Sequence, residues 1–213
     1  MTPSTEQSLA ISSVGTMTQS DTLHPSFLHD HYLVRRKFWR VFGGEFRVFD
    51  RSGALVFFSE QAAFRLREDF RVYPDERQSE ELLSIKTEQI IDLAATFKVY
   101  DGPTGKLIGS LKRKALKSLV KDEWTIFDAN GMEIGLVSEE NLALALLSRL
   151  IGLIPQSFVI TSHGGTTVAE IRQLFNPFIL KNQLTIASPK PPIDRRLIVA
   201  TVILLAGIER RQG

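Results

Sequence analysis

The stretch "DRRLIVATVILLAGIERR", residues 194–211, decides the fold, because its middle is apolar on every side of a helix apart from Thr201. The hydrocarbon core of a bilayer, about 30 Å thick, needs about 20 apolar residues, whereas Leu197–Ile208 covers only about 18 Å as a helix. A helix that is hydrophobic all round must still be surrounded, and if lipid does not surround it, protein does. The sequence therefore predicts a central buried helix over residues 193–210.

Composition favours one ordinary globular domain. The chain has 213 residues and is 43% hydrophobic, which suffices for one substantial core. Its 26 Lys and Arg against 24 Asp and Glu leave a net charge of +2, so only local clusters could attract an anionic partner, and we expect no nucleic acid. The absence of cysteine excludes disulfides, a thiolate nucleophile and a cysteine-based zinc site. A cytoplasmic location, peripheral at a membrane or fully soluble, is compatible with this composition.

The N-terminal residues differ in character from the rest. The stretch "MTPSTEQSLAISSVGTMTQSDTL" is rich in Ser, Thr and Gln and lacks the basic start and apolar run of a secretory signal. We therefore predict a disordered tail over residues 1–28 and a single folded domain over residues 29–213.

A repeated hairpin pattern fills the centre of the chain. It occurs as "FRVFDRSGALVFF" from Phe46, "FKVYDGPTGKLIG" from Phe97 and "WTIFDANGMEIG" from Trp124, each with an Asp and a Gly between two alternating runs. Asp accepts hydrogen bonds from turn amides, and Gly adopts the positive φ that hairpin loops require. These segments are therefore predicted to be β-hairpins.

Further segments extend this pattern to ten to twelve strands. "FVITSHGGTTVAEI" from Phe158 is predicted to be a fourth hairpin, and "FILKNQLTI" from Phe178 a fifth, with Lys181 and Asn182 at its turn. Residues 64–74 and 81–100 are predicted to be strands as well. One internal helix is expected in "SEENLALALLSRLIG", residues 138–152, with Ser138 as its N-cap. Many short antiparallel strands indicate a sandwich or a barrel.

In order, the hairpins with their FD-x-x-G turns, the segment "LFNPFILKNQLTI" and the closing "IDRRLIVATVILLAGIE" resemble the phospholipid scramblase and LURP-one-related family of the Tubby C-terminal-like superfamily. The resemblance covers residues 30–211. It implies a mainly β fold, a closed antiparallel barrel of about 12 strands around a central hydrophobic C-terminal helix. It also implies binding of phosphoinositide head groups by surface Lys and Arg, as in Tubby-type domains, or calcium-dependent lipid movement between leaflets, as in scramblases.

For calcium, the resemblance implies an acidic stretch just before the terminal helix. Here that stretch is "TIASPKPPIDRR", in which Asp194 is the only carboxylate. Calcium takes six to eight oxygen ligands, usually with several carboxylates among them. We therefore predict no metal site.

The segment "SLKRKALKSLVK" provides the first candidate lipid-binding cluster, Lys112, Arg113, Lys114 and Lys117. Side chains alternate along a strand, so Lys112 and Lys114 would share a face and could bind a phosphate. The alternative is a solvated strand edge, where lysine prevents unwanted pairing.

The segment "VRRKFWR" provides the second candidate cluster, Arg35, Arg36 and Lys37 beside Trp39. Such a mixture of cationic and aromatic residues suits a membrane interface. The alternative is an ordinary barrel strand whose Trp points inward.

No motif predicts catalysis. The chain contains neither a Gly-x-Ser-x-Gly elbow nor a glycine-rich phosphate loop, so no catalytic residue and no cofactor are predicted. The leading hypothesis is a non-enzymatic barrel that binds acidic phospholipid head groups, or a protein partner, at a membrane surface. The alternatives are a phospholipid scramblase whose C-terminal helix inserts into the membrane, and a soluble structural scaffold. The sequence leaves the oligomeric state open.

Overall fold

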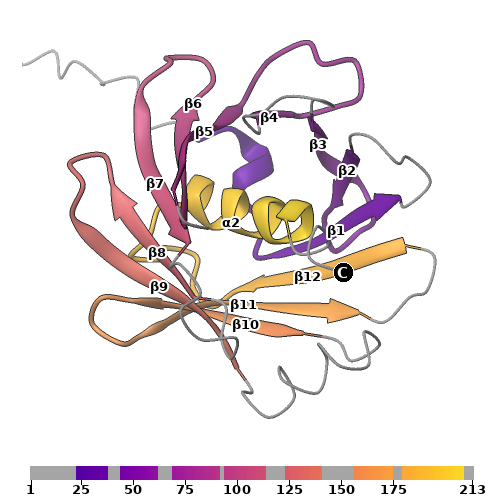
Figure 1. The fold of residues 1–213 in the computed structure, drawn as a ribbon. Coiled ribbons are helices and arrows are strands. Elements are labelled where there is room, and N and C mark those ends of the chain that lie inside the picture. Colours follow the sequence, from indigo (N-terminus) through magenta and orange to yellow (C-terminus); the bar gives the residue numbers. More distant parts are fainter. Residues whose placement is uncertain are drawn as a thin grey trace, which may run out of the picture.

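The computed structural model describes residues 23–37, 44–61, 69–91, 94–113, 123–140, 156–174 and 179–208. In this part of the chain, twelve antiparallel strands close into a barrel, and helix α2 (Arg195–Ile208) passes through its middle (Figure 1). A short 3-10 helix, η1 (Pro25–Leu28), precedes the strands. The strands are β1 (His31–Lys37), β2 (Gly44–Phe49), β3 (Leu55–Gln61), β4 (Asp69–Tyr73), β5 (Leu83–Ile91), β6 (Ala94–Asp101), β7 (Leu107–Arg113), β8 (Glu123–Asp128), β9 (Glu133–Glu139), β10 (Ser157–Ser162), β11 (Thr167–Leu174) and β12 (Ile179–Ile186). The predicted mainly β barrel around a C-terminal helix is confirmed.

Each strand pairs with its neighbours in the chain, and β1 pairs with β12 to close the barrel. Asp–Gly turns make several of these connections. In the turn between β2 and β3, the Asp50 carboxylate accepts hydrogen bonds from the Ala54 amide and the Ser52 hydroxyl, and Gly53 has a φ of 86°. Gly131, in the turn between β8 and β9, has a φ of 81°. The turn chemistry expected from the sequence is therefore present.

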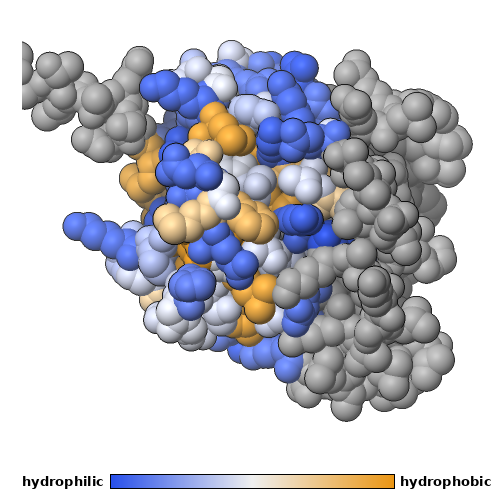
Figure 2. Space-filling view, turned by 60° about the vertical axis from the view of Figure 1, so that its left-hand side comes forward, coloured by the Kyte–Doolittle hydropathy of each residue, from blue (hydrophilic) through white to orange (hydrophobic). Residues whose placement is uncertain are grey.

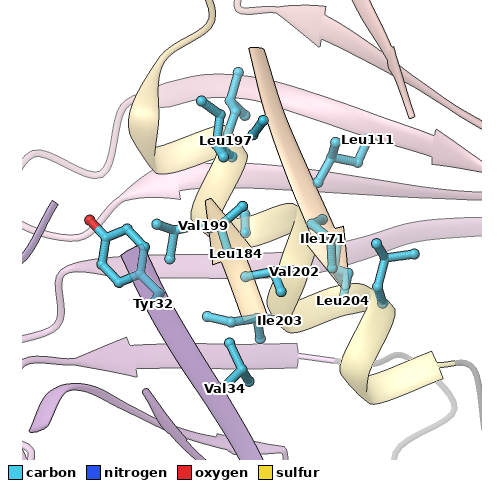
Figure 3. Packing of buried hydrophobic residues seen from close by; sticks show 14 of the residues in the cluster. Tyr32, Val34, Leu111, Ile171, Leu184, Leu197, Val199, Val202, Ile203 and Leu204 are labelled. Atoms are coloured by element: carbon cyan, nitrogen blue, oxygen red, sulfur yellow. The ribbon is translucent and has the colours of Figure 1, made fainter. Parts of the chain in front are cut away.

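Helix α2 forms the centre of the core. Every residue from Leu197 to Ala206 is at most 2% exposed. Side chains from β1, β7, β11 and β12 point at it, as Figure 3 shows for Tyr32 and Leu184. Its single internal polar residue, Thr201, satisfies its hydroxyl by donating to the Leu197 carbonyl at 2.8 Å. The apolar run is thus surrounded by protein, as its length requires.

Two glycines allow strands and helix to approach closely. A methyl group on Gly109 of β7 would lie 2.2 Å from the Phe127 carbonyl oxygen and 3.0 Å from the Leu197 side chain. One on Gly207 of α2 would lie 2.9 Å from the Phe70 ring. Any larger residue at either position would force the wall away from the helix.

Polar groups fix the first turn of α2. The Asp194 carboxylate accepts a hydrogen bond from the Arg196 amide at 2.8 Å, which is N-cap geometry. Arg195 is 5% exposed and donates to the carbonyl oxygens of Phe27 and His29. These bonds tie η1 and the entry to β1 onto the start of the helix.

The C-terminal part of the strand wall differs from the prediction. "FILKNQLTI" is not a hairpin: residues Ile179–Ile186 form the single strand β12. Asn182, the expected turn residue, is 3% exposed on the inner face. Asn favours turns and rarely occupies an inward strand position, which explains the wrong interpretation.

Two other boundaries also differ. Ser138 lies inside β9, paired with Val159 of β10, so it does not cap a helix; most of the predicted helix, residues 141–152, lies outside the described residues. The predicted tail ends too late, because Pro25–Leu28 forms η1 and Phe27 is 2% exposed in the core. Residues 1–22 of that tail lie outside the described part.

Candidate functional site

The second predicted cluster divides between the two faces of β1. Arg36 points inward, where its Nη1 atom donates to the carbonyl oxygens of Ala206 and Gly207 at 3.1 and 3.2 Å. Its guanidinium also lies over the Phe46 ring. Because the last carbonyls of a helix lack partners within it, Arg36 caps the C-terminal end of α2. Arg35 is exposed on the outer face, and the side chain of Lys37 lies outside the described part.

The first predicted cluster divides in the same way. Arg113 is 8% exposed, and its guanidinium lies over the Trp124 ring, 5.8 Å from the centroid. Lys112 is exposed and is flanked in register by Thr96 of β6 and Thr125 of β8. Lys114 and Lys117 lie outside the described residues. Of this cluster, the structure therefore describes one exposed cation, Lys112, and its neighbours on the adjacent strands are neutral.

Register brings two further cations beside Arg35. It pairs with Lys181 of β12 on one side and with Arg47 of β2 on the other. Directly paired residues share a face of the sheet, so the three cations form one line across three adjacent strands. We call Lys181, Arg35 and Arg47 the basic row. Lys181, which was expected at a turn, and Arg47 were not among the candidate residues predicted from the sequence.

Carboxylates neutralise only one end of the basic row. Arg47 forms ion pairs with Glu45 at 3.1 Å and Glu76 at 2.6 Å, and the hydrogen bond to Glu76 raises the pKa of Arg47. Arg35 instead lies over the Phe49 ring, 4.6 Å from its centroid. Within the described ranges, no carboxylate forms an ion pair with Arg35 or Lys181. Like charges directly opposite each other destabilise a strand pair, so this juxtaposition lowers stability unless an anion binds there.

An apolar side chain borders the basic row. Leu174 of β11 pairs in register with Lys181 and is 39% exposed. Cations next to an exposed aliphatic side chain suit the boundary between phospholipid head groups and acyl chains. By contrast, the side of the molecule that faces left in Figure 1 carries its hydrophobic residues in small groups among hydrophilic ones (Figure 2). Scattered apolar residues of that kind are normal for a soluble surface.

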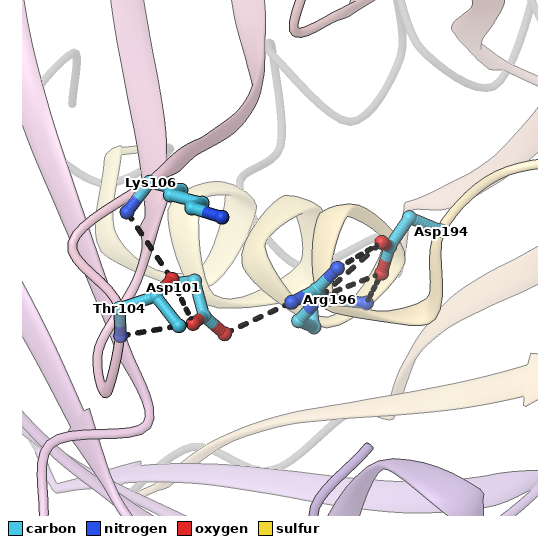
Figure 4. A network of polar contacts seen from close by, with 5 residues as sticks. All are labelled: Asp101, Thr104, Lys106, Asp194 and Arg196. Carbon is cyan, nitrogen blue, oxygen red and sulfur yellow. Dashed lines mark hydrogen bonds and ion pairs between the residues drawn. The ribbon is translucent and has the colours of Figure 1, made fainter. Parts of the chain in front are cut away.

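A pocket of about 690 Å³ lies at the opposite end of the barrel from the basic row, beside the N-terminus of α2. Its polar floor is an ion network in which Arg196 donates to Asp194 and to Asp101 of β6 (Figure 4). Burial alone would raise the pKa of Asp101, but hydrogen bonds from Thr104 and Arg196 outweigh it, so this pKa lies below its usual range. The guanidinium occupies the space between the two carboxylates.

This network bears on the calcium question. Asp101 and Asp194 are brought together by the fold, yet each already binds Arg196. Among the residues that the structure describes, no group of three or more His, Cys, Asp or Glu side chains could hold a metal ion. Nor is any helix in the described ranges both long enough and apolar enough to cross a bilayer.

The fold places this protein in the class of closed antiparallel barrels whose core is a hydrophobic C-terminal helix. A family model described as LURP-one-related matches residues 31–206. The chain therefore belongs to the LURP-one-related family. Neither the curated proteins nor the solved structures give a significant match to it.

Proposed function

We propose that this LURP-one-related barrel is a non-catalytic protein that binds acidic phospholipid head groups at a membrane surface through the basic row. The observation that carries the proposal is the pairing of Arg35 with Lys181 across β1 and β12 without a carboxylate among the described residues. A phosphate between them would remove the like-charge repulsion and accept a fork of hydrogen bonds from the guanidinium. The cytoplasmic, membrane-peripheral location expected from the sequence accompanies this function.

The expected strength of binding follows from the number of free cations. Each Lys or Arg close to an anionic surface contributes about 1 kcal/mol, so Arg35 and Lys181 together contribute about 2 kcal/mol, or about 30-fold in affinity. Leu174 adds apolar contact next to them. Peripheral binding of this size is reversible and depends on salt, because charge interactions are screened over about 8 Å at physiological ionic strength.

Vesicle flotation tests the proposal. The full chain is mixed with phosphatidylcholine vesicles with and without phosphatidylserine, at low and at physiological salt. Wild type should float only with phosphatidylserine, and Arg35→Glu combined with Lys181→Glu should weaken binding at least about 30-fold, because it reverses both charges. The difference should shrink as salt rises. An unchanged thermal melt confirms that the variant is folded.

Lys112→Glu is the matched control. Counted around the barrel in either direction, β7 is six strands from β1, so Lys112 lies on the opposite wall and should not affect flotation. If Lys112→Glu abolishes flotation and the basic-row variant does not, the site is on β7. If wild type does not float at all, the lipid proposal fails and the scaffold hypothesis replaces it.

The scramblase alternative lacks a comparable observation. Insertion of α2 into a membrane would require the barrel to release a helix that is at most 2% exposed from Leu197 to Ala206. It would also break the contacts of Arg36 and Arg196 at the two ends of that helix. We therefore keep surface binding as the proposed function.

A further inference from the structure

Two of the three cations in the basic row are available to a ligand. Arg35 of β1 and Lys181 of β12 are directly opposite each other on the outer face. The Cβ atoms of such a pair are about 5 Å apart, so both charged groups can reach the same small anion. Arg47, the third member of the row, is already bound by Glu45 and Glu76. We call Arg35 and Lys181 the cation pair.

The carboxylates closest to the cation pair are few, and arginines bind them. Strands β1 and β12 contain no acidic residue, and the two strands beside them contain one each, Glu45 in β2 and Glu170 in β11. Glu45 binds Arg47, and Glu170 binds Arg172 at 2.9 Å. The connecting residues 38–43 and 175–178 contain no Asp or Glu.

The charge of this part of the wall is therefore positive. The described cations of its outer face are Arg35, Arg47, Arg172 and Lys181, and the carboxylates that reach it are Glu45, Glu76 and Glu170. Four positive charges against three negative ones leave one positive charge. Since all three carboxylates lie on Arg47 and Arg172, the positive charge is concentrated at the cation pair.

The contact of Arg35 with Phe49 prepares its guanidinium for a phosphate. The guanidinium lies over the Phe49 ring, 4.6 Å from the centroid. Stacking on an aromatic face fixes the plane of the guanidinium and leaves the N–H groups at its edge, which match two phosphate oxygens. Lys181 adds a point charge beside this fork. The cation pair therefore fits a single phosphate group.

The number of charges selects the kind of phosphate. A phosphomonoester carries a charge of about −1.5 to −2 at pH 7 and has three strong acceptor oxygens, so one such group can neutralise both cations. A phosphodiester has only one charge and fewer free oxygens. Phosphatidylserine adds a carboxylate to its phosphodiester but also an ammonium group, which the two cations repel. The cation pair therefore favours a lipid that ends in a phosphomonoester.

The position of Leu174 selects where on the lipid that phosphomonoester lies. Leu174 pairs directly with Lys181, on the side away from Arg35, and is 39% exposed. A phosphate bound by Lys181 therefore has an apolar side chain about 5 Å away. In phosphatidic acid the phosphomonoester is attached to the glycerol, next to the acyl chains. In a phosphoinositide the inositol ring separates the two, which would leave Leu174 in water.

We propose that the cation pair recognises the phosphomonoester of phosphatidic acid, with Leu174 against the adjoining glycerol and acyl chains. This inference rests on the proposed function and names the lipid that the basic row binds best. Arg35 supplies the fork of hydrogen bonds and Lys181 the second charge. The barrel then responds to the chemistry of the head group and not only to the surface charge of the membrane.

Flotation at matched surface charge tests this inference on the full chain. Three sets of phosphatidylcholine vesicles contain phosphatidic acid, phosphatidylserine or a phosphatidylinositol monophosphate, and all are adjusted to the same electrophoretic mobility so that nonspecific attraction is equal. Wild type should bind the phosphatidic acid vesicles at least about fivefold more tightly than either other set, the gain expected from one further charge in contact. Millimolar glycerol phosphate should not displace it.

Three exposed or partly exposed positions provide the variants. Arg35→Lys keeps the charge and removes the fork, so it should weaken binding to phosphatidic acid several-fold and to phosphatidylserine by less. Leu174→Ser should reduce the preference for phosphatidic acid over the phosphoinositide. Arg172→Lys is the matched control, because Arg172 is on the same wall but already binds Glu170, and it should leave both ratios unchanged. Thermal melts close to that of wild type show that the variants are folded.

The outcomes separate this inference from the proposed function. Equal binding to the three vesicle sets, or tighter binding to either of the other two, overturns the inference but leaves binding of acidic lipids in place. An unchanged lipid preference in Arg35→Lys also overturns it. Displacement by glycerol phosphate would show that the site takes a soluble phosphate ester instead of a lipid. If wild type floats with none of the three sets, the proposed function fails and the inference fails with it.

Discussion

Arg35 and Arg36 are adjacent in the chain but have different roles: one is an exposed cation and the other caps α2. The alternation of a strand places Arg35 on the outer wall and Arg36 inside, at the carbonyl end of α2. Basic residues that are consecutive in a strand therefore do not form one cluster in the folded protein, because they alternate between its two faces. Half of such a run belongs to the interior and serves stability.

The two residues provide a direct comparison. Arg36→Ala removes the donor of two hydrogen bonds to helix carbonyls and leaves those carbonyls partly buried without their partner. We expect it to lower the free energy of unfolding by about 1 to 3 kcal/mol. Arg35→Ala, at an exposed position, should change it by less than about 0.5 kcal/mol. Urea unfolding of both variants measures the difference, and equal values would show that Arg36 does not cap the helix.

At the scale of single residues, the sequence identified Arg35 but not its partners. Lys181 is far from Arg35 in the chain, and only the β1–β12 register brings them together. Register is a tertiary property, fixed by which face of each strand is buried. Lys181 and Asn182 are also residues typical of turns, and for this reason the sequence did not indicate that they lie within a strand.

At the element scale, the hairpin between β6 and β7 is tied to the start of α2. Asp101 ends β6, accepts hydrogen bonds from its own turn through Thr104, and binds the Arg196 guanidinium at 2.9 Å. Asp128, at the same position in the turn between β8 and β9, accepts hydrogen bonds from Asn130 and Met132 of its own turn. The first Asp links wall to core, whereas the second shapes a turn.

This difference predicts a pH dependence. The pKa of Asp101 in the folded protein is lowered from 3.8, so its ionised form stabilises the fold above that pH, and the contribution is lost as pH falls through the lower folded value. Asp101→Asn should therefore lower stability by about 1.5 to 3 kcal/mol at pH 7. The gap to wild type should close as pH falls below about 4. Thermal melts across this range measure it.

Asp128→Asn is the control for that experiment, because it keeps a side chain that can accept the same turn hydrogen bonds without touching an arginine. At pH 7 this substitution should lower the stability of the fold by less than Asp101→Asn does. If the two variants lose equal stability with equal pH dependence, the ion pair with Arg196 contributes nothing and the turn alone explains the loss.

Elements with strong local chemistry were predictable from the sequence, and elements without it were not. Asp50 with Gly53, and Asp128 with Gly131, form hairpin turns because the side chain and the backbone both favour a turn there. Ser138 was expected to start a helix but lies within β9, where pairing on both sides overrides its capping preference. Asn182 shows the same override inside β12.

At the scale of the whole molecule, wall and helix form one cooperative unit. The inner side chains of the strands and the apolar side chains of α2 belong to one buried cluster, which also includes Phe27 of η1. The all-round apolar run predicted that protein surrounds this helix, because its length is too short to span a bilayer. The closed barrel around it was what the family resemblance implied. The order of the strands followed from the hairpins, since each connects neighbours.

A single charge in α2 tests this interdependence. Leu204 is 1% exposed, and Leu204→Asp would place a carboxylate in the core without a partner. We expect a loss of at least about 4 kcal/mol and unfolding of the whole domain rather than of the helix alone. Circular dichroism and a thermal melt record the outcome. A cooperative transition close to that of wild type would rule out a helix that holds the barrel together.

The position of α2 in the chain has a consequence for biosynthesis. The ribosome releases β1 to β12 before residues 195–208, so the nascent wall has no core to close around while it is being made. The pairing of β1 with β12 must also wait until almost the whole domain has emerged. Closure of the barrel therefore has to follow synthesis of the helix, and until the helix arrives the inner faces of the strands are exposed to whatever binds apolar segments in the cell, chaperones foremost.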